Sequence, residues 1–280
     1  MKKETGKKSI VFQLVVIPLI IGLLLAIAFW VWCAYDAKKH QTIAREIIDP
    51  KAAEFIAQNH PGNDFIIEDA VYSFYNSQYT VFVSSPSSTD TYFSIGYHYK
   101  TLEYIWDNYY RVTEGYTTRS RLLAEYEYRV MNCLDSLEEL DTIDVRFCQY
   151  SETTSRAYGS SPAGLDPATL ILDQPYDESM GDRYGDLSLT LVVPPESGNI
   201  ESALSYLLEL DALLTESGAG YYVLEIYLGS TPLSSIVSPE FHIYGVRRED
   251  LHCEDPLSRL QQLWNEQEAH RQEIKAGYEK

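Results

Sequence analysis

Basic residues are scarce in this sequence. The chain has 22 Lys and Arg against 41 Asp and Glu, so its formal net charge is −19. A surface of that sign repels the phosphates of nucleic acid and of anionic lipid headgroups. It suits solubility, association with cations, or a basic partner. We therefore expect no nucleic-acid partner, and a solvated acidic surface without a specific ligand is the simplest alternative to a basic partner.

Cysteine is also scarce, with four residues in the chain. Cys33 lies in an apolar segment, and Cys133, Cys148 and Cys253 follow it. Their spacing matches no zinc signature. In an extracellular region, Cys133 and Cys148 are candidates for a disulfide between a helix and the next strand. The alternative is that the thiols are free and pack as small hydrophobes.

Local catalytic patterns are missing. The sequence has no Gly-x-Ser-x-Gly, no phosphate-binding loop, no dinucleotide fingerprint and no His-Glu-x-x-His pattern. Active sites can be assembled from residues far apart in sequence, so this absence makes an enzyme less expected without excluding one. The sequence predicts no catalytic residue, no cofactor and no metal site.

One long apolar run is present, at residues 9–35. A helix needs roughly 20 apolar residues to cross a bilayer, and this run is longer. Trp30, Trp32 and Tyr35 at its end are typical of the aromatic belt at a membrane interface. A cleaved signal has a shorter apolar core followed by small residues, whereas bulky Trp30 and Trp32 stand here. We expect an uncleaved transmembrane helix.

The flanking charges give a weak signal of orientation. Four lysines precede the run and four basic residues follow it closely, so the positive-inside count is a tie. The first four fall within residues 1–8, and a short tail before a long domain is the usual form of a signal anchor. We expect this basic tail inside, a juxtamembrane segment at 36–48, and residues 36–280 outside. Residues 1–35 carry +3, which leaves −22 for the remainder.

Residues 49–115 predict an α+β unit made of a helix, a three-stranded antiparallel meander and a second short helix. Asp49 is a good N-cap and Pro50 fits the first helical position. Alternating apolar residues predict strands at 65–75, 79–85 and 91–99. The closing helix rests on apolar residues at helical spacing: Leu102, Ile105, Trp106, Tyr109 and Tyr110.

Residues 116–280 predict a second α+β unit with a mixed sheet. Helices are expected at 119–140, from the cap Asn199 to Gly218, and at 256–276. Strands are expected at 144–150, 187–193, 221–228 and 241–246, with at least one crossover helix between strands. Residues 151–186, rich in Gly, Pro, Ser and Asp, are expected to form an irregular insertion.

Parts of the chain resemble a known group of proteins. The runs at 52–55, 72–75 and 79–83 look like the repeated helix-then-meander domain of YfjL-like proteins, uncharacterised membrane-anchored proteins and lipoproteins of Gram-positive bacteria. The stretch at 241–246, followed by Glu249, Asp250 and Leu251, is similar to a second recurring piece of them. The resemblance implies a surface-exposed, membrane-tethered domain, and it brings no activity or catalytic residue.

Two groups of residues invite a metal-site interpretation. The acidic residues Asp173, Asp177, Glu178, Asp182 and Asp186 offer the oxygens that calcium prefers, but they lack the tight spacing of a calcium loop. A solvated loop is the simpler interpretation. His242, His252 and Cys253 are metal-ligand types, yet His252 and Cys253 are adjacent, and a strand histidine such as His242 is usually a half-exposed sheet residue.

Tyrosine is abundant, with 23 residues in the chain. Its ring combines a large apolar area with a polar tip, and it is enriched at recognition surfaces. The alternative is that the rings cover a thin sheet with a small core. The candidate binding surface consists of Tyr92, Tyr97, Tyr99, Tyr104, Tyr109 and Tyr110.

These features favour a single-pass bacterial membrane protein whose extracytoplasmic region acts by binding an envelope protein, a peptide or cell-wall material. Two alternatives stay open: an envelope enzyme with a site assembled from distant residues, and a small regulatory subunit of a membrane complex. The span carries no charge, which weakens the last alternative because charge-paired spans are one way such subunits dock.

Overall fold

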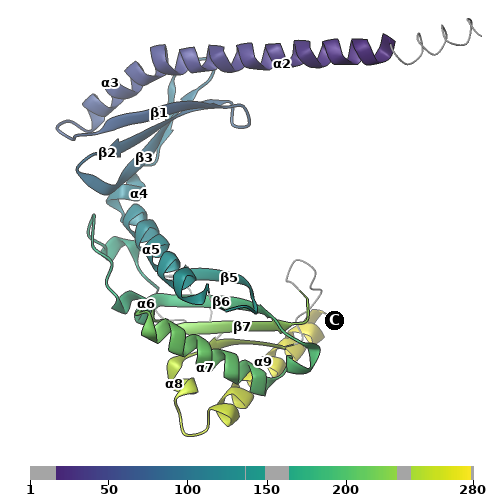
Figure 1. Ribbon diagram of the computed structural model, residues 1–280. Helices are drawn as coiled ribbons and strands as arrows, with labels where there is room; N and C mark the ends of the chain where they lie inside the picture. The colour runs from purple at the N-terminus through teal and green to yellow at the C-terminus, as the bar shows by residue number, and fades with distance from the viewer. Residues whose placement is uncertain (1–16, 136, 149–163, 232–240, 279–280) are drawn as a thin grey trace, which may run out of the picture. The chain divides into compact units, whose positions relative to one another are not determined.

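A computed structural model describes residues 17–135, 137–148, 164–231 and 241–278. The fold is α+β and divides into two compact units, one ending at Val112 and the other beginning at Thr113 (Figure 1). The first unit contains a long apolar helix and an antiparallel sheet, and the second contains a mixed sheet. The fold class predicted from the sequence is confirmed.

The first unit begins with one uninterrupted helical segment. Helix α2 (Ile17–Ile43), the π-helical turn η2 (Ala44–Ile48) and α3 (Asp49–Asn59) follow one another without a break (Figure 1). This segment is long and apolar enough to cross a membrane, and the most apolar part of it is not buried by the rest of the protein. The large apolar side chains between Leu19 and Tyr35 are exposed.

The helix predicted to begin at Asp49 does not begin there, because the chain is already helical. The backbone N–H of Asp49 donates to the carbonyl of Ala44, which is the i→i−5 bond of a π turn. Pro50 has no N–H, and it follows directly after this turn. Burial of Ala44 and Ile48 against the sheet keeps the residues before Asp49 helical.

The helical segment packs on the sheet through a stripe of four residues, Ala44, Ile48, Ala52 and Ile56, here called the helical stripe. They recur every four residues, and an ideal α-helix would turn such a stripe slowly away from the sheet, since its turn holds 3.6 residues. The wider π turn at Ala44–Ile48 counteracts that drift.

Four strands form the first sheet, in the order β1-β2-β3-β4, and all neighbours are antiparallel. They are β1 (Ile66–Ser73), β2 (Gln78–Ser85), β3 (Ser88–His98) and β4 (Tyr104–Asp107). The face toward the helical stripe carries the buried side chains Tyr79, Val81, Val83, Phe93, Ile95 and Tyr97.

The fourth strand corrects the sequence-based prediction of three strands and a closing helix at 102–110. Only α4 (Tyr110–Thr113) is helical in this region. Trp106 pairs with Gly96 across β3 and β4, and its Nε1 donates to Gln78 Oε1 at 3.3 Å. The indole lies where a β-carbon on residue 96 would stand. Because Gly96 leaves room for the indole, Trp106 is placed on a strand beside it. The spacing of apolar residues in the sequence does not show this contact.

The second unit is built on a mixed sheet in the order β5-β6-β7-β8. Strands β6 (Gly185–Val192) and β7 (Val223–Gly229) are parallel, and the crossover helix α7 (Ile200–Glu216) joins them. Strands β5 (Leu140–Phe147) and β8 (Phe241–Val246) pair antiparallel at the two edges. The predicted mixed sheet and crossover helix are confirmed, as is the cap of α7, where Asn199 Oδ1 accepts from Ser202 N at 3.0 Å.

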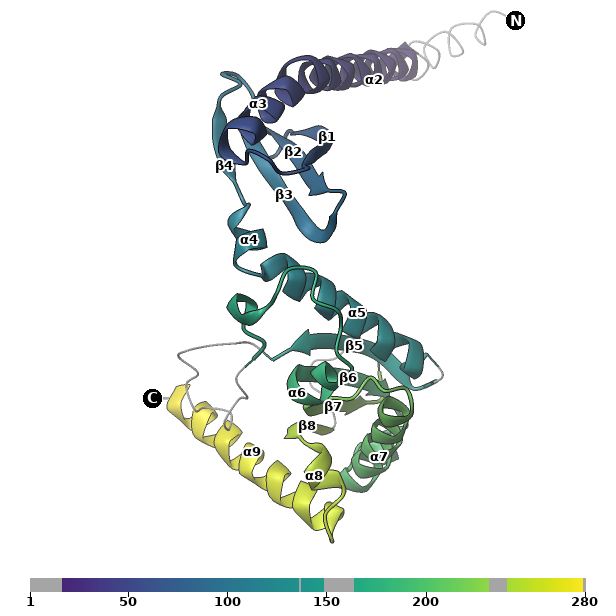
Figure 2. The ribbon, with the colours of Figure 1, turned by 90° about the vertical axis from the view of Figure 1, so that its left-hand side faces the viewer.

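Helices cover only part of this sheet. Helices α5 (Tyr116–Leu134) and α7 pack on one face and share its apolar core (Figures 1 and 2). Helix α9 (Pro256–Tyr278) lies along β8, where the Gln267 side chain donates to the carbonyl of Tyr244 at 2.7 Å and accepts from its N–H. The side-chain amide of Gln267 therefore satisfies the edge of β8 much as another strand would.

The described part of the predicted insertion contains short helices rather than only loop. Residues 164–184 include η4 (Pro167–Thr169) and α6 (Ser179–Tyr184). Residues 149–163 lie outside the described part of the chain. A further short helix, α8 (Arg248–Leu251), follows β8.

Almost all of the net negative charge belongs to the second unit. Up to Val112 the sequence has 10 Lys and Arg against 11 Asp and Glu, a net charge of −1. From Thr113 onward it has 12 against 30, a net charge of −18. The unit that contains the apolar helix is thus nearly neutral.

The contact between Gly96 and Trp106 gives a first prediction. A β-carbon on residue 96 would lie 2.4 Å from Trp106 Nε1, so Gly96→Ala should destabilise the first unit by about 1–3 kcal/mol. Pulse proteolysis in urea measures the loss. Ser94→Ala, on the same strand and face, is the control and should change little. Equal stability of the two variants would contradict the proposed packing.

Candidate functional site

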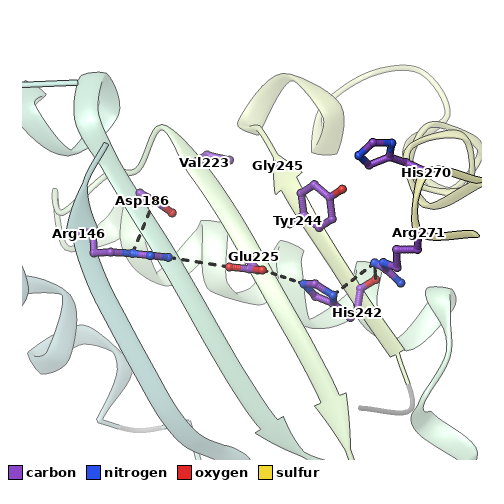
Figure 3. Close-up of a pocket in the computed structure, with 9 residues that line it drawn as sticks. All are labelled: Arg146, Asp186, Val223, Glu225, His242, Tyr244, Gly245, His270 and Arg271. Carbon is purple, nitrogen blue, oxygen red and sulfur yellow. Dashed lines mark hydrogen bonds and ion pairs between the residues drawn. The ribbon is translucent and has the colours of Figure 1, made fainter. Parts of the chain in front are cut away.

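One face of the second sheet is open and polar. Opposite α5 and α7, alternate strand residues carry hydrogen-bonding side chains, here called the polar face: Arg146, Asp186, Ser188, Glu225, Tyr227 and His242. With His270 and Arg271 from α9, part of this face lines a pocket of ≈ 450 Å³ (Figure 3). This pocket is the candidate site in the second unit.

Charged groups cross the polar face from β5 to α9. Arg146 lies 3.8 Å from Asp186 and 4.0 Å from Glu225, measured between its guanidinium nitrogens and their carboxylate oxygens. Glu225 Oε1 lies 2.8 Å from His242 Nε2, and Arg271 approaches the other side of the same ring (Figure 3). The row connects four strands and a helix by ion pairs and hydrogen bonds.

The neighbours of His242 indicate the hydrogen-bonding roles of its two ring nitrogens. Arg271 can only donate, and its guanidinium lies 3.3 Å from Nδ1, so Nδ1 is the acceptor. Nε2 then carries the proton and donates to Glu225. Both ring nitrogens are engaged, and the Tyr227 ring stacks on the imidazole at 4.0 Å. His242 therefore has no nitrogen left to act as a general base in this arrangement.

The two carboxylates on this face behave differently. Burial alone would raise the pKa of Glu225, but hydrogen bonds from His242 and Tyr227 outweigh it, so the pKa is below the usual value. Burial raises the pKa of Asp186, and the nearby Arg146 offsets only part of that effect. The face therefore holds a firmly ionised Glu225 beside an Asp186 that takes up a proton more readily.

A second polar cluster centres on the buried Asp211 of α7. Its Oδ1 accepts from Tyr221 Oη at 2.9 Å and from Arg248 Nε at 2.8 Å, and its Oδ2 lies 2.7 Å from His252 Nε2. Burial tends to raise the pKa of Asp211, but these donors lower it further, so the net pKa lies below the usual range. The cluster ties α7 to the chain before β7 and to α8.

Several of the residues weighed as metal ligands make other contacts. Asp177 accepts from Ser179 N at 3.0 Å at the start of α6 and pairs with Arg183, while Asp186 faces Arg146. His242 and His252 lie against different carboxylates. Within the described residues, no group of three His, Cys, Asp or Glu is arranged to hold a metal ion.

The cysteines are free thiols. Cys133 donates to the carbonyl of Val130 at 3.1 Å, and Cys148 is buried. Burial raises the pKa of Cys148 to about 11, so its thiol stays protonated at neutral pH. The sequence left open a disulfide or free thiols, and the structure has free thiols.

The six candidate tyrosines do not share one surface. Tyr97 is buried at 3% exposure and points toward the helices, whereas Tyr92 on the same strand is 47% exposed. Tyr99 and Tyr109 are half-buried. Tyr109 packs in an aromatic group with His60, Phe65 and Phe93.

Two of the remaining tyrosines are exposed at separate places. Tyr104 of β4 stacks on Phe55 at 4.9 Å, and Tyr110 lies on α4. Much of the tyrosine content of the first unit therefore lines and borders its core. Tyr92, Tyr104 and Tyr110 keep enough exposed area to contact a partner.

Comparison of the chain with protein-family models, with curated proteins and with solved structures finds no match in any of the three.

Sequence reasoning did not find the polar face. The available signal was the alternation of polar residues in the predicted strands: Ser188 alternates with leucines, and Glu225 and Tyr227 alternate with Leu224 and Ile226. That pattern predicts one solvated face. It does not predict which polar residues meet, because their meeting depends on the order and register of four strands.

The Asp211 cluster generates a prediction about acid stability. The pKa of Asp211 is lower in the folded protein than the value of about 3.9 in an unfolded chain. Its stabilising effect is therefore complete above that value and is lost as the pH falls through the folded-state pKa. Asp211→Asn should lower the free energy of unfolding of the second unit by about 2–4 kcal/mol at neutral pH.

The same variant should also flatten the acid limb of the stability curve. Urea unfolding measured from neutral to acidic pH tests both effects. Asp182→Asn is the matched control, because Asp182 faces the same Arg248 at 3.4 Å from a more exposed position; a change below about 1 kcal/mol is expected. If both variants lose stability equally, Asp211 does not have the role described.

Proposed function

We propose that this protein is a single-pass membrane protein that holds an acidic binding domain outside the cell. Helix α2 is the anchor, and the region after it is extracytoplasmic. The second unit contacts the partner, which is an envelope protein or peptide with basic side chains, or cell-wall material.

The continuity of the helix from Leu19 to Asn59 is the observation that carries this proposal. Cleavage of a signal peptide near residues 30–35 would separate the apolar run from the folded unit. Here the helical segment goes on from the apolar run and supplies the helical stripe to the core of the first unit. His40, only five residues after Tyr35, already contacts the sheet through Tyr79 Oη at 2.6 Å.

The charge and the polar face support a binding role for the second unit. Its net charge of −18 favours a cationic partner by long-range attraction. The polar face is pre-organised, since its side chains are already fixed by ion pairs and hydrogen bonds. On the edge strand β5, Asp144 pairs with Ser188 of this face and lies beside Arg146, and its exposed carboxylate is available to a basic group. The resemblance to YfjL-like proteins, which implies a tethered surface domain, is consistent with this proposal.

The side of the membrane can be tested with the native cysteine Cys253, which is free and exposed. A membrane-impermeant maleimide should label the protein in intact cells, and Cys253→Ser should remove most of the signal because Cys148 is buried and Cys133 only partly exposed. Labelling that appears only after lysis would place the second unit in the cytoplasm and overturn the proposed orientation.

The binding role can be tested with a photoreactive amino acid on the polar face. Asp144 is a suitable position because its side chain is 64% exposed. Illumination of cells should yield a discrete adduct with a basic protein, peptide or wall fragment, and high salt before illumination should weaken it. A probe at the exposed Tyr128 on α5 is the control. Equal adducts at both positions, or none at either, would count against a binding role for this face.

A further inference from the structure

The turn between β1 and β2, residues 74–77, is here called the hairpin tip, and it exposes two aromatic rings. Phe74 is 82% exposed and Tyr75 is 96% exposed. Both follow β1, whose residue Tyr72 packs at the core of the first unit. The transfer of two rings of this size from water into an apolar or interfacial environment is favourable in free energy.

The course of β1 places the hairpin tip on the side of the anchor. At its start, Ile66 and Ile67 border one pocket with Ala53 and Ile56 of α3. Further along, Tyr72 stacks on His40 of α2 with ring centroids 3.7 Å apart. The strand therefore runs antiparallel to the helical segment, as Figure 1 also shows.

The groove between β1 and α2 continues to the aromatic end of the apolar run. It has a volume of ≈ 880 Å³, and its lining includes Val71 from β1, Phe74 from the hairpin tip, and Trp32 and Cys33 from α2. Phe74 and Trp32 thus border the same groove. Trp32 belongs to the aromatic belt expected at the membrane interface.

Distances along the chain indicate how far the hairpin tip lies from the hydrocarbon core of the bilayer. Residues 17–35 of α2 extend over about 28 Å at ~1.5 Å per residue, close to the ~30 Å of a hydrocarbon core. His40 then lies about 7 Å above Tyr35, within the headgroup layer or at its outer edge. From Tyr72, which stacks on His40, the chain returns at most about 10 Å to reach Tyr75. The separation of about 7 Å between His40 and Tyr35 is within that limit, so the chain is long enough for Tyr75 to reach the level of Tyr35.

The charges nearby suit a lipid surface. Exposed Lys38 and Lys39 follow Tyr35 by about one turn. The β3–β4 turn lies beside the hairpin tip, since Tyr99 N donates to Ser77 O at 3.4 Å, and it carries the exposed Lys100. Lysines at this level can reach lipid phosphates while their stems follow apolar surface. Residues 36–112, which lie on this side of the membrane in the proposed topology, have 6 Lys and Arg against 10 Asp and Glu, a net charge of −4, so they repel anionic lipid less than the second unit with its −18.

We infer that the hairpin tip is a second membrane contact, in which Phe74 and Tyr75 insert into the headgroup region of the leaflet from which α2 emerges. This inference rests on the proposed role of α2 as a membrane anchor. Two contacts, a span and a hairpin, fix the tilt and rotation of the first unit on the bilayer, which a single span does not.

The test uses the full-length protein in vesicles of phosphatidylcholine and phosphatidylglycerol that contain an alkyne-tagged lipid. Benzoylphenylalanine replaces one residue at a time, at Tyr75, at Tyr92 or at Leu24. Tyr92 pairs with Ser84 near the opposite end of the same sheet and is the negative control. Leu24 in the apolar run of α2 is the positive control for the anchor. All three side chains are exposed, so the substitutions leave the core unchanged.

After illumination, the probe at Tyr75 should give a lipid adduct several times more abundant than the probe at Tyr92. If Leu24 gives the lipid adduct and Tyr75 does not exceed Tyr92, the inference about the hairpin tip fails and the anchor stands. If Leu24 itself gives no lipid adduct, the anchor fails, and the inference fails with it. Adducts from Tyr75 to protein instead of lipid would assign the hairpin tip to a protein partner and would also overturn the inference.

Discussion

The packing of the helical stripe on the first sheet is the contact on which the rest of the first unit depends. Each of these residues belongs to a helix that begins in the apolar run, so the same backbone that is long and apolar enough to span a membrane also completes the core of a water-soluble unit. Without that contact the sheet would expose Val81, Val83 and Ile95, and the apolar run would not be joined to a helix that packs in the core. The contact makes the helix part of the fold.

This arrangement divides the physical tasks between the two units. The first is rich in aromatic side chains and carries far less negative charge than the second, which suits a position beside lipid. The second carries nearly all the excess negative charge and an open polar sheet face. On that face, Glu225 and Arg271 engage both nitrogens of His242. Such a row of fixed donors and acceptors favours recognition over proton transfer.

The main strands and the crossover helix of the second unit followed from the sequence, because strong alternation and a clear cap at Asn199 agree with the tertiary structure. The short helices η4, α6 and α8 did not. Two local sequence patterns in the first unit led to wrong predictions of secondary structure. The pair Asp49 and Pro50 has the form of a helix start, but burial on both sides keeps the chain helical through it. Trp106 fits a helical spacing, but the space beside Gly96 makes it a strand residue. The polar face could not be predicted, since its members meet only through strand order and register.

Amide hydrogen exchange of the full-length protein in lipid nanodiscs tests whether the helix continues from the apolar run into the core, because it reports on the backbone between them. The continuous helix predicts that amides 36–48 exchange slowly, at rates comparable with those of α3. Exchange of these amides at the rate of an unstructured peptide, with α3 still protected, would show a flexible linker and would contradict the account.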